Sequence, residues 1–277
     1  MTRTPVDPVL KWVGSKRQLR EALRDLLPQG ARLVEPFVGS GAVFGALDYP
    51  SYFLADKNED LILFHQMLMW QGERFIKLCA AYFRERTNTE DRYYKLREEF
   101  NTTRDAWDRA ALFLYLNRHG FNGLWRVNNK GECNVPYGWH KRPPYFPRAE
   151  LVAMQAYMQE KQPLFVAQGF EATLAQCRPG DVVYMDPPYA PASATANFAK
   201  YTVDGFDNGC QARLVEWSVK LRNAGVWVAI SNSDTPYTRS LYSEATEIVA
   251  VLVQRSVAAN GSRRGKAPEV IAVYAPR

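Results

Sequence analysis

Cysteine and histidine are scarce in this sequence of 277 residues. It contains four cysteines and three histidines, without a C-x-x-C pair and without a histidine at metal-ligand spacing from a cysteine. Few, scattered cysteines argue against a disulfide scaffold, and the missing spacing pattern argues against a zinc site. We therefore expect reduced thiols in a cytoplasmic protein, and no bound metal.

Long apolar runs are also missing. No segment approaches the roughly 18 consecutive apolar residues of a membrane-spanning helix, and residues 1–10 lack the apolar core of a signal peptide. The sequence has no internal repeat and no low-complexity tract. Apolar residues make up 47% and charged residues 23%, which are ordinary values for a globular protein. We expect one large or two small domains and no membrane partner.

Acidic residues are under-represented in two segments of a chain whose formal net charge is +6. Residues 117–148 contain six Lys or Arg, six aromatic residues and a single acid, Glu132. This composition is typical of nucleic-acid binding, in which cations meet phosphates and aromatic rings stack on bases. The alternative is a loop that packs on the protein core. Arg118 and Arg126 are two of the cations in this segment.

The second segment lies between Glu247 and Glu269, where the sequence has no acid. A Gly- and Arg-containing stretch there, with Asn260, Arg263 and Arg264, predicts a flexible loop that contacts phosphates. The alternative is a solvated turn.

The remaining chain reads as an α/β fold. Apolar, strand-like runs occupy residues 32–34, 52–55, 164–166, 182–185, 226–230, 248–253 and 270–274. Helical patterns occupy residues 19–27, 57–107, 110–116, 148–159 and 210–223. Strand-like runs therefore stand on both sides of a helical insertion. In this insertion the residues 128–131, Asn-Asn-Lys-Gly, predict the turn of a β-hairpin. The last two runs predict an antiparallel pair.

The tetrapeptide Asp186-Pro187-Pro188-Tyr189 directly follows one of these strands. Ligands of open α/β sheets bind at the carboxyl ends of strands. The two prolines restrict the backbone, so the segment presents one carboxylate, one backbone carbonyl and one aromatic face. The carboxylate and the carbonyl can accept both N–H groups of an exocyclic amine, and the ring can stack on its base. The alternative is a strand that simply ends at a Pro-Pro turn.

A glycine-containing turn follows the first strand, in the sequence Glu35-Pro36-Phe37-Val38-Gly39-Ser40-Gly41. Glycines there allow a ligand to approach the backbone, and we expect a helix to follow. Asp56 ends the next strand, at the place where nucleoside-binding sheets direct an acid to ribose hydroxyls. The alternative is an ordinary exposed acid at a strand end.

Together these motifs resemble the Dam-type DNA adenine-N6 methyltransferases. The resemblance rests on Lys-Trp-x-Gly-Ser-Lys at residues 11–16, the glycine turn, Leu-Ala-Asp at 54–56 and Asp-Pro-Pro-Tyr at 186–189, in that order. It covers nearly the whole chain and includes residues 113–118, 134–136, 193–198 and 230–232. The implied fold is a Rossmann-like methyltransferase sheet. Residues 1–56 and 160–277 are expected to form the catalytic domain, and residues 57–159 a DNA target-recognition insertion.

The resemblance also implies the reaction and its residues. A methyl group is expected to pass from S-adenosylmethionine to N6 of a flipped-out adenine in duplex DNA, with GATC as the target. Asp186, Pro187, Pro188 and Tyr189 match the catalytic motif. The cofactor-binding candidates are Trp12, Lys16, Glu35, Phe37, Gly39, Gly41, Asp56 and Asp186. The DNA-binding candidates are Lys11, Arg118, Phe121, Asn122, Leu124, Arg126, Pro136, His140, Asn260, Arg263 and Arg264. We further expect a monomer that is associated with the nucleoid.

The sequence leaves three alternatives open, which concern the target sequence, the substrate and the activity itself. His140 and Trp125 depart from the family's pattern, which makes them candidates for altered target reading. The same chemistry could act on an amine in RNA or in a protein glutamine, although glutamine methyltransferases usually carry Asn at the position of Asp186. A catalytically silent DNA-binding protein would be expected to lose Asp186, Tyr189 or the glycine turn, and all of these are present.

Overall fold

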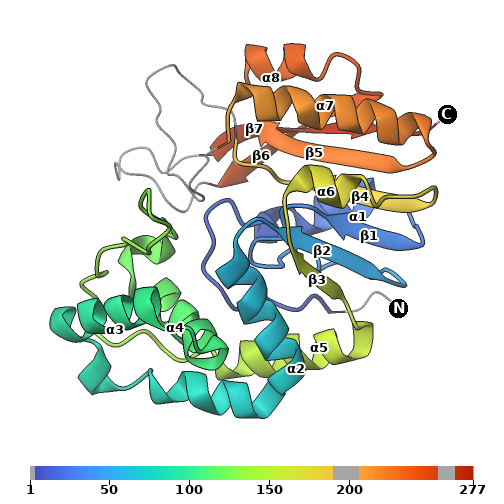
Figure 1. The fold of residues 1–277 in the computed structure, drawn as a ribbon. Coiled ribbons are helices and arrows are strands. Elements are labelled where there is room, and N and C mark those ends of the chain that lie inside the picture. The colour runs from blue at the N-terminus through green and yellow to red at the C-terminus, as the bar shows by residue number, and fades with distance from the viewer. Residues whose placement is uncertain (1–3, 190–205, 255–265, 277) are drawn as a thin grey trace.

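The computed structural model describes residues 4–189, 206–254 and 266–276. Within them a seven-stranded sheet has the order β3-β2-β1-β4-β5-β7-β6 (Figure 1). The strands are β1 (Arg32–Glu35), β2 (Tyr52–Asp56), β3 (Leu164–Ala167), β4 (Asp181–Met185), β5 (Trp227–Ser233), β6 (Glu247–Gln254) and β7 (Lys266–Tyr274). The first five in this order are parallel, whereas β7 is antiparallel to both β5 and β6. The predicted α/β fold and the predicted antiparallel pair are therefore confirmed.

The helices form two groups around the sheet. They are α1 (Arg20–Leu26), α2 (Glu59–Ala81), α3 (Glu90–Thr102), α4 (Ala106–His119), α5 (Arg148–Lys161), α6 (Phe170–Leu174), α7 (Asn208–Asn223) and α8 (Pro236–Leu241), with short 3-10 turns at Lys16–Leu19, Glu85–Thr87 and Phe121–Gly123. Figure 1 shows α2 to α5 gathered beside the β3 edge, away from α7 and α8. Among the described residues, no helix is both long and apolar enough to span a membrane.

Local signals explain where the long helices begin. The side chain of Asn58 accepts from the backbone N–H of Leu61 at the start of α2. Asp105 accepts from two N–H groups at the start of α4. Such caps satisfy backbone donors that a helix leaves unpaired in its first turn.

The core lies on both faces of the sheet because strand side chains alternate between them. Leu33 and Leu54 belong to a cluster that continues through α1 and into α2, α4 and α5. Val34 and Phe53, their neighbours along β1 and β2, belong to a second cluster with α6 and α7. The sheet and the helical insertion thus share one continuous apolar cluster, which fixes their relative position.

The helix expected after the glycine turn is not present, and that prediction was wrong. Residues 42–46 form turns, with hydrogen bonds from Gly45 N to Gly41 O and from Leu47 N to Val43 O. Two contacts from remote segments hold this conformation. Val6 N donates to Gly45 O at 2.8 Å, and a Cβ at Gly45 would lie only 2.6 Å from the carbonyl oxygen of Val6.

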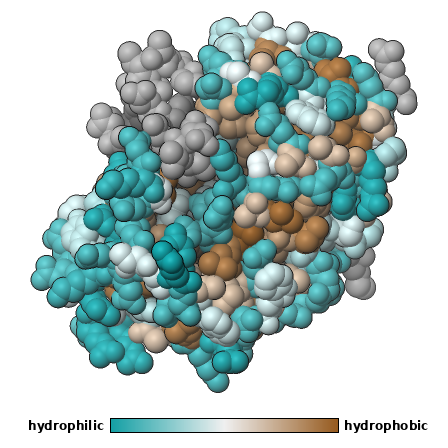
Figure 2. Space-filling view, in the orientation of Figure 1, coloured by the Kyte–Doolittle hydropathy of each residue, from teal (hydrophilic) through white to brown (hydrophobic). Residues whose placement is uncertain are grey.

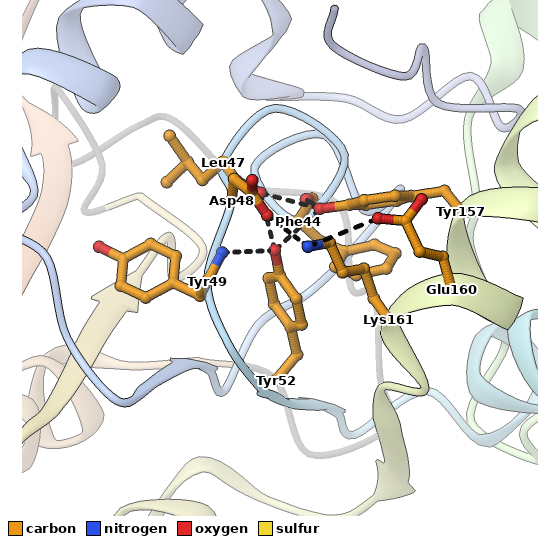
Figure 3. Close-up of polar contacts among 8 residues, drawn as sticks. All are labelled: Phe44, Leu47, Asp48, Tyr49, Tyr52, Tyr157, Glu160 and Lys161. Atoms are coloured by element: carbon orange, nitrogen blue, oxygen red, sulfur yellow. Dashed lines mark hydrogen bonds and ion pairs between the residues drawn. The ribbon is translucent and has the colours of Figure 1, made fainter. Parts of the chain in front are cut away.

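The second contact is a buried tyrosine pair (Figure 3). The hydroxyl groups of Tyr52 and Tyr157 are 2.8 Å apart, and both donate to the carbonyl of Leu47. Tyr157 comes from α5, so the end of the helical insertion is tied to the turn that follows the glycine motif. Nearby, Lys161 forms an ion pair with Asp48.

The predicted β-hairpin is present as an antiparallel pair without regular strands. We call residues 120–138 the arm. Its two sides meet at isolated bridges, Gly120 with Tyr137 and Val127 with Cys133. The predicted turn lies at its tip, where Gly131 N donates to Asn128 O. Residues 117–119, which the composition assigned to the loop, instead complete α4.

Candidate active site

Three acids meet where neighbouring strands end. Glu35 ends β1, Asp56 ends β2 and Asp186 follows β4. The chain runs from β1 outwards to β2 and β3, and later from β4 outwards to β5. The boundary between β1 and β4 is therefore the switch point at which open α/β sheets bind ligands.

The glycine turn is fastened beside Asp56. Gly39 N donates to the Asp56 carboxylate at 3.1 Å. His65 of α2 holds the other side of the same residue, because its Nε2 lies 3.0 Å from Gly39 O, which can only accept. The backbone of Gly39 has φ +50°, and a Cβ there would lie 3.0 Å from the Trp12 ring. The position therefore favours glycine for its conformation and for space.

Asp56 is an acid in a poorly solvated place. Burial raises the pKa of Asp56 to about 6, although backbone N–H donors from Asn58 and Gly39 act in the opposite direction. Its carboxylate is thus aimed and held by two backbone groups. A ligand with hydroxyl donors would stabilise its ionised form.

Lys16 and Asp186 form a buried ion pair. The Lys16 Nζ lies 2.7 Å from the Asp186 Oδ1, and the exposed fractions of the two side chains are 4% and 21%. Lys16 also donates to Gly14 O and lies 4.8 Å from the centre of the Tyr189 ring. Burial raises the pKa of Asp186, and the Lys16 ammonium opposes this shift. The motif at residues 11–16 is therefore brought directly to the tetrapeptide.

The tetrapeptide is anchored by residues that the sequence motifs did not single out. Gln211 of α7 donates to Pro188 O at 2.8 Å, and Asn232 of β5 donates to Gln211 in turn. The Tyr189 hydroxyl donates to Glu269 of β7 at 2.7 Å. Gln211 and Glu269 are distant in sequence and belong to no recognisable motif, whereas Asn232 lies in the segment 230–232 that carried part of the resemblance.

Glu35 is almost fully buried beside these groups. Among the described residues, one of its carboxylate oxygens has no hydrogen-bond partner. Burial raises the pKa of Glu35 well above its usual range, and the nearby Asp186 carboxylate raises it further. An unpartnered buried acceptor calls for a donor from a ligand. Phe37, two residues later, packs against Phe170 and Phe206.

The DNA-binding candidates form a second group. Lys11 is exposed, and its backbone makes two hydrogen bonds with the side chain of Asn117 on α4. Its aliphatic stem packs on Gly123, where a Cβ would clash with it. Of the candidates on the arm, Phe121, Asn122 and Arg126 are exposed, and Leu124 and Pro136 are half-buried; His140 lies half-buried just beyond its end. The structure thus brings Lys11 to the arm.

Arg126 is held in place by its neighbour across the arm. Its guanidinium donates to the side-chain oxygen and the carbonyl of Asn134. The side chain is exposed. Figure 2 shows that hydrophilic side chains dominate the helical half of this face of the molecule.

Several side chains of the basic, aromatic segment are buried, among them one DNA-binding candidate and one possible altered reader. Arg118 is only 6% exposed and its guanidinium lies over the ring of Tyr145. Trp125 is 2% exposed and packs against Phe100 and Phe113. Trp125, a candidate for altered target reading, thus fills the core under the arm with its ring and does not face solvent. Asn260, Arg263 and Arg264 lie outside the described residues, as do residues 193–198.

Known protein families identify the class of enzyme to which these residues belong. The family described as D12 class N6 adenine-specific DNA methyltransferase matches residues 12–257. The chain belongs to this family.

Relatives in this family extend over almost the whole chain. A DNA adenine methylase of Salmonella typhi is 44% identical over 267 residues, which cover 96% of this chain and 95% of the relative. DNA adenine methylases of Escherichia coli strain K12 and of a Vibrio cholerae strain are 43% and 41% identical, with the same coverage. The chain is therefore a DNA adenine-N6 methyltransferase with an α/β methyltransferase fold. Among the described residues, no cluster of His, Cys, Asp and Glu could hold a metal ion.

Proposed function

We propose that this enzyme methylates N6 of adenine in GATC sequences of duplex DNA, with S-adenosylmethionine as the methyl donor. One observation carries the proposal: the Asp186 carboxylate stands at the switch point of the sheet, paired with Lys16 and adjacent to the Tyr189 ring. The target GATC and the cofactor follow from the resemblance to Dam-type enzymes. The geometry supports the chemistry.

The residues of the site fit this cofactor. Asp56 offers a held carboxylate to ribose hydroxyls, and the unpartnered oxygen of Glu35 can accept from an ammonium group. Trp12 and Phe37 supply aromatic surface, and the turn at Gly39 and Gly41 permits close approach to the backbone. When bound, S-adenosylmethionine supplies an electrophilic methyl group on a sulfonium.

Asp186 and Pro187 act on the adenine amine. The N6 lone pair is delocalised into the ring, which makes this nitrogen a poor nucleophile. Hydrogen bonds from both N–H groups, to the Asp186 carboxylate and the Pro187 carbonyl, favour a more tetrahedral nitrogen and stabilise the charge that develops on it. The Lys16 ammonium opposes the rise in the pKa of Asp186 that burial causes, and so favours the ionised form that can accept such a bond. Gln211 fixes the following carbonyl, of Pro188, and so the direction of the tetrapeptide.

The adenine must leave the duplex to reach these groups, which costs a few kcal/mol. Stacking on Tyr189 would return about 1–3 kcal/mol, by analogy with single-strand binders. Phe121 is 41% exposed on the arm, next to Asn122 with its left-handed backbone, and could fill the vacated place in the stack. Tyr189 would thus stabilise the flipped-out adenine, and Phe121 would stabilise the duplex that the adenine has left.

We assign target reading to residues 57–159 and catalysis to residues 1–56 and 160–277. Lys11, Asn122, Leu124, Arg126, Pro136 and His140 contact the target bases and their flanks, and Asn260, Arg263 and Arg264 contact phosphates. The buried Arg118 contributes by holding Tyr145 and the end of α4. The enzyme acts on DNA as a monomer in the cytoplasm.

Methylation-sensitive sequencing of unmethylated plasmid, treated with the purified protein and S-adenosylmethionine, tests the proposal. We expect N6-methyladenine confined to GATC. Asp186→Ala should abolish methylation while DNA binding persists, and Asp48→Asn, at an exposed acid in a surface ion pair, is the matched control. Methylated adenine at other sequences would refute the GATC target. An active Asp186→Ala variant would refute the mechanism.

A further inference from the structure

A buried acid outside every recognised motif touches the tetrapeptide. Glu269 lies on β7, in register with Ser233 of β5 and with Val251 of β6. It is 8% exposed, and one of its carboxylate oxygens, Oε2, accepts from the Tyr189 hydroxyl at 2.7 Å. The two residues are separated by 80 positions in the chain. Glu269 and Tyr189 are therefore neighbours because of the folded sheet, although they are far apart in the chain.

Lys16, the cation beside the Tyr189 ring, already has two other partners. Lys16 donates to Gly14 O and pairs with Asp186, both at less than 3 Å. The Glu269 carboxylate instead receives a neutral phenol hydroxyl. Burying a carboxylate is costly unless its hydrogen bonds are made, so this contact stabilises Glu269 where it stands.

The contact also completes the support of the Tyr189 ring. The backbone before Tyr189 is held by the bond from Gln211 to Pro188 O. The hydroxyl at the far end of the ring is held by Glu269. With its backbone and its hydroxyl both held, the Tyr189 side chain stays in place before substrate arrives.

We propose that Glu269 is a positioning residue, which orients the Tyr189 ring so that its face receives the target adenine. The proposal rests on the proposed role of Tyr189 in stacking. Glu269 itself does not touch substrate. Its loss is expected to slow methyl transfer without weakening cofactor binding.

Single-turnover methylation of a GATC duplex by three variants tests this role. Glu269→Ala should lower the rate about 10- to 100-fold, which corresponds to one lost charge-assisted hydrogen bond, while the Kd for S-adenosylmethionine stays within about twofold. Glu269→Gln should recover most of the rate, since the amide oxygen can accept from the same hydroxyl. Glu247→Ala, at an exposed acid of β6, is the matched control and should leave the rate unchanged.

Tyr189→Phe separates positioning from a general loss of structure. This variant removes the hydroxyl and keeps the ring, so it should slow transfer at least as much as Glu269→Ala, since the hydroxyl also interacts with Asp186. In the Tyr189→Phe background, Glu269→Ala should then add little. If Glu269→Ala does not fold, Tyr189→Phe still tests the bond.

Three outcomes would overturn the proposal: an unchanged rate in Glu269→Ala, an unchanged rate in Tyr189→Phe, or additive losses in the double variant. Failure of the proposed function itself looks different. If Tyr189→Ala methylates DNA at the normal rate, stacking on this ring is wrong and the role of Glu269 falls with it. If Tyr189→Ala is inactive while Glu269→Ala is normal, only the positioning role is wrong.

Discussion

Replacing Lys16 by methionine should destabilise the cofactor-free enzyme at neutral pH. The 4% exposed ammonium pairs with Asp186 at 2.7 Å, and methionine fills a similar volume without charge. Removing one partner of a buried pair leaves the other charge uncompensated, which typically costs 3–5 kcal/mol. Because the Asp186 side chain is 21% exposed, we expect about 3 kcal/mol. The melting temperature should then fall by about 6–12 °C.

The chain contains a matched control for this substitution. Lys161 and Asp48 are 2.5 Å apart, but Asp48 is 60% exposed. A surface pair contributes about 0–1 kcal/mol, so Lys161→Met should lower the melting temperature by no more than about 4 °C. The double variant Lys16→Met/Asp186→Asn removes both buried charges and should recover most of the lost stability.

The pH dependence gives a second measure of the same effect. Burial already raises the pKa of Asp186, and the loss of Lys16 raises it further. The native state of Lys16→Met then holds a proton at a pH where the unfolded chain has lost it. Its deficit relative to the wild type should therefore shrink as the pH falls towards the pKa of an unfolded aspartate. Calorimetric melts between pH 5 and 8 measure this. Equal deficits in Lys16→Met and Lys161→Met, or a deficit that grows in acid, would refute the reasoning.

Three further predictions concern the cofactor and DNA sites. Burial raises the pKa of Asp56 to about 6, so the affinity for S-adenosylmethionine should fall as the pH drops through 6. For the same reason the free protein should gain up to about 3 kcal/mol of stability as the pH falls from 6 to 4. Calorimetric titrations that give the same Kd at pH 5 and 8 would contradict this. Arg126→Ala should cost about 1–3 kcal/mol at one base pair of the target, measured with single-base variants of GATC; unchanged discrimination would exclude base reading. Trp139 and Trp70 are 58% and 62% exposed, but only Trp139 adjoins the arm. DNA should therefore reduce acrylamide quenching of the protein fluorescence more in Trp70→Phe protein than in Trp139→Phe protein, and equal protection of the two variants would contradict this.

The strands could be predicted from sequence because buried parallel strands appear as short apolar runs. The predicted run at 182–185 differs from β4 by one residue. The missing helix after Gly41 could not be predicted in this way. Its turn conformation depends on Val6 and on Tyr157, which come from remote segments, together with Tyr52 of the next strand. Local propensity cannot express such contacts.

The arm shows where composition misleads. The cations and aromatic residues of residues 117–148 predict nucleic-acid binding, with packing on the protein core as the alternative, and the structure shows both exposed and buried side chains. In an extended chain, successive side chains point to opposite faces. Cys133, Val135 and Tyr137 are buried, and Trp125 is buried while its neighbour Arg126 is exposed. The alternation of apolar residues at 133, 135 and 137 was a signal that could have identified the inner face.

The residues that hold the tetrapeptide could not be predicted from the sequence, for a different reason. Motifs name residues that stand close together in the chain, whereas Glu269 and Gln211 reach the tetrapeptide through β7 and α7. The order of the sheet decides this proximity. Since β5 separates β4 from β7, the contact between Tyr189, which follows β4 in the tetrapeptide, and Glu269 of β7 is made by side chains and not by strand pairing.

The segment from Lys11 to Lys16 links the two halves of the function. Asn117 of α4 fastens the backbone of Lys11 beside the arm with two hydrogen bonds. One residue later, Trp12 packs on Gly39, and at the end of the segment Lys16 pairs with Asp186. A single short stretch therefore touches the arm, the glycine turn and Asp186. The same six residues of chain, 11–16, join the arm to Asp186, and among the described residues no other motif of the sequence makes contacts in both places.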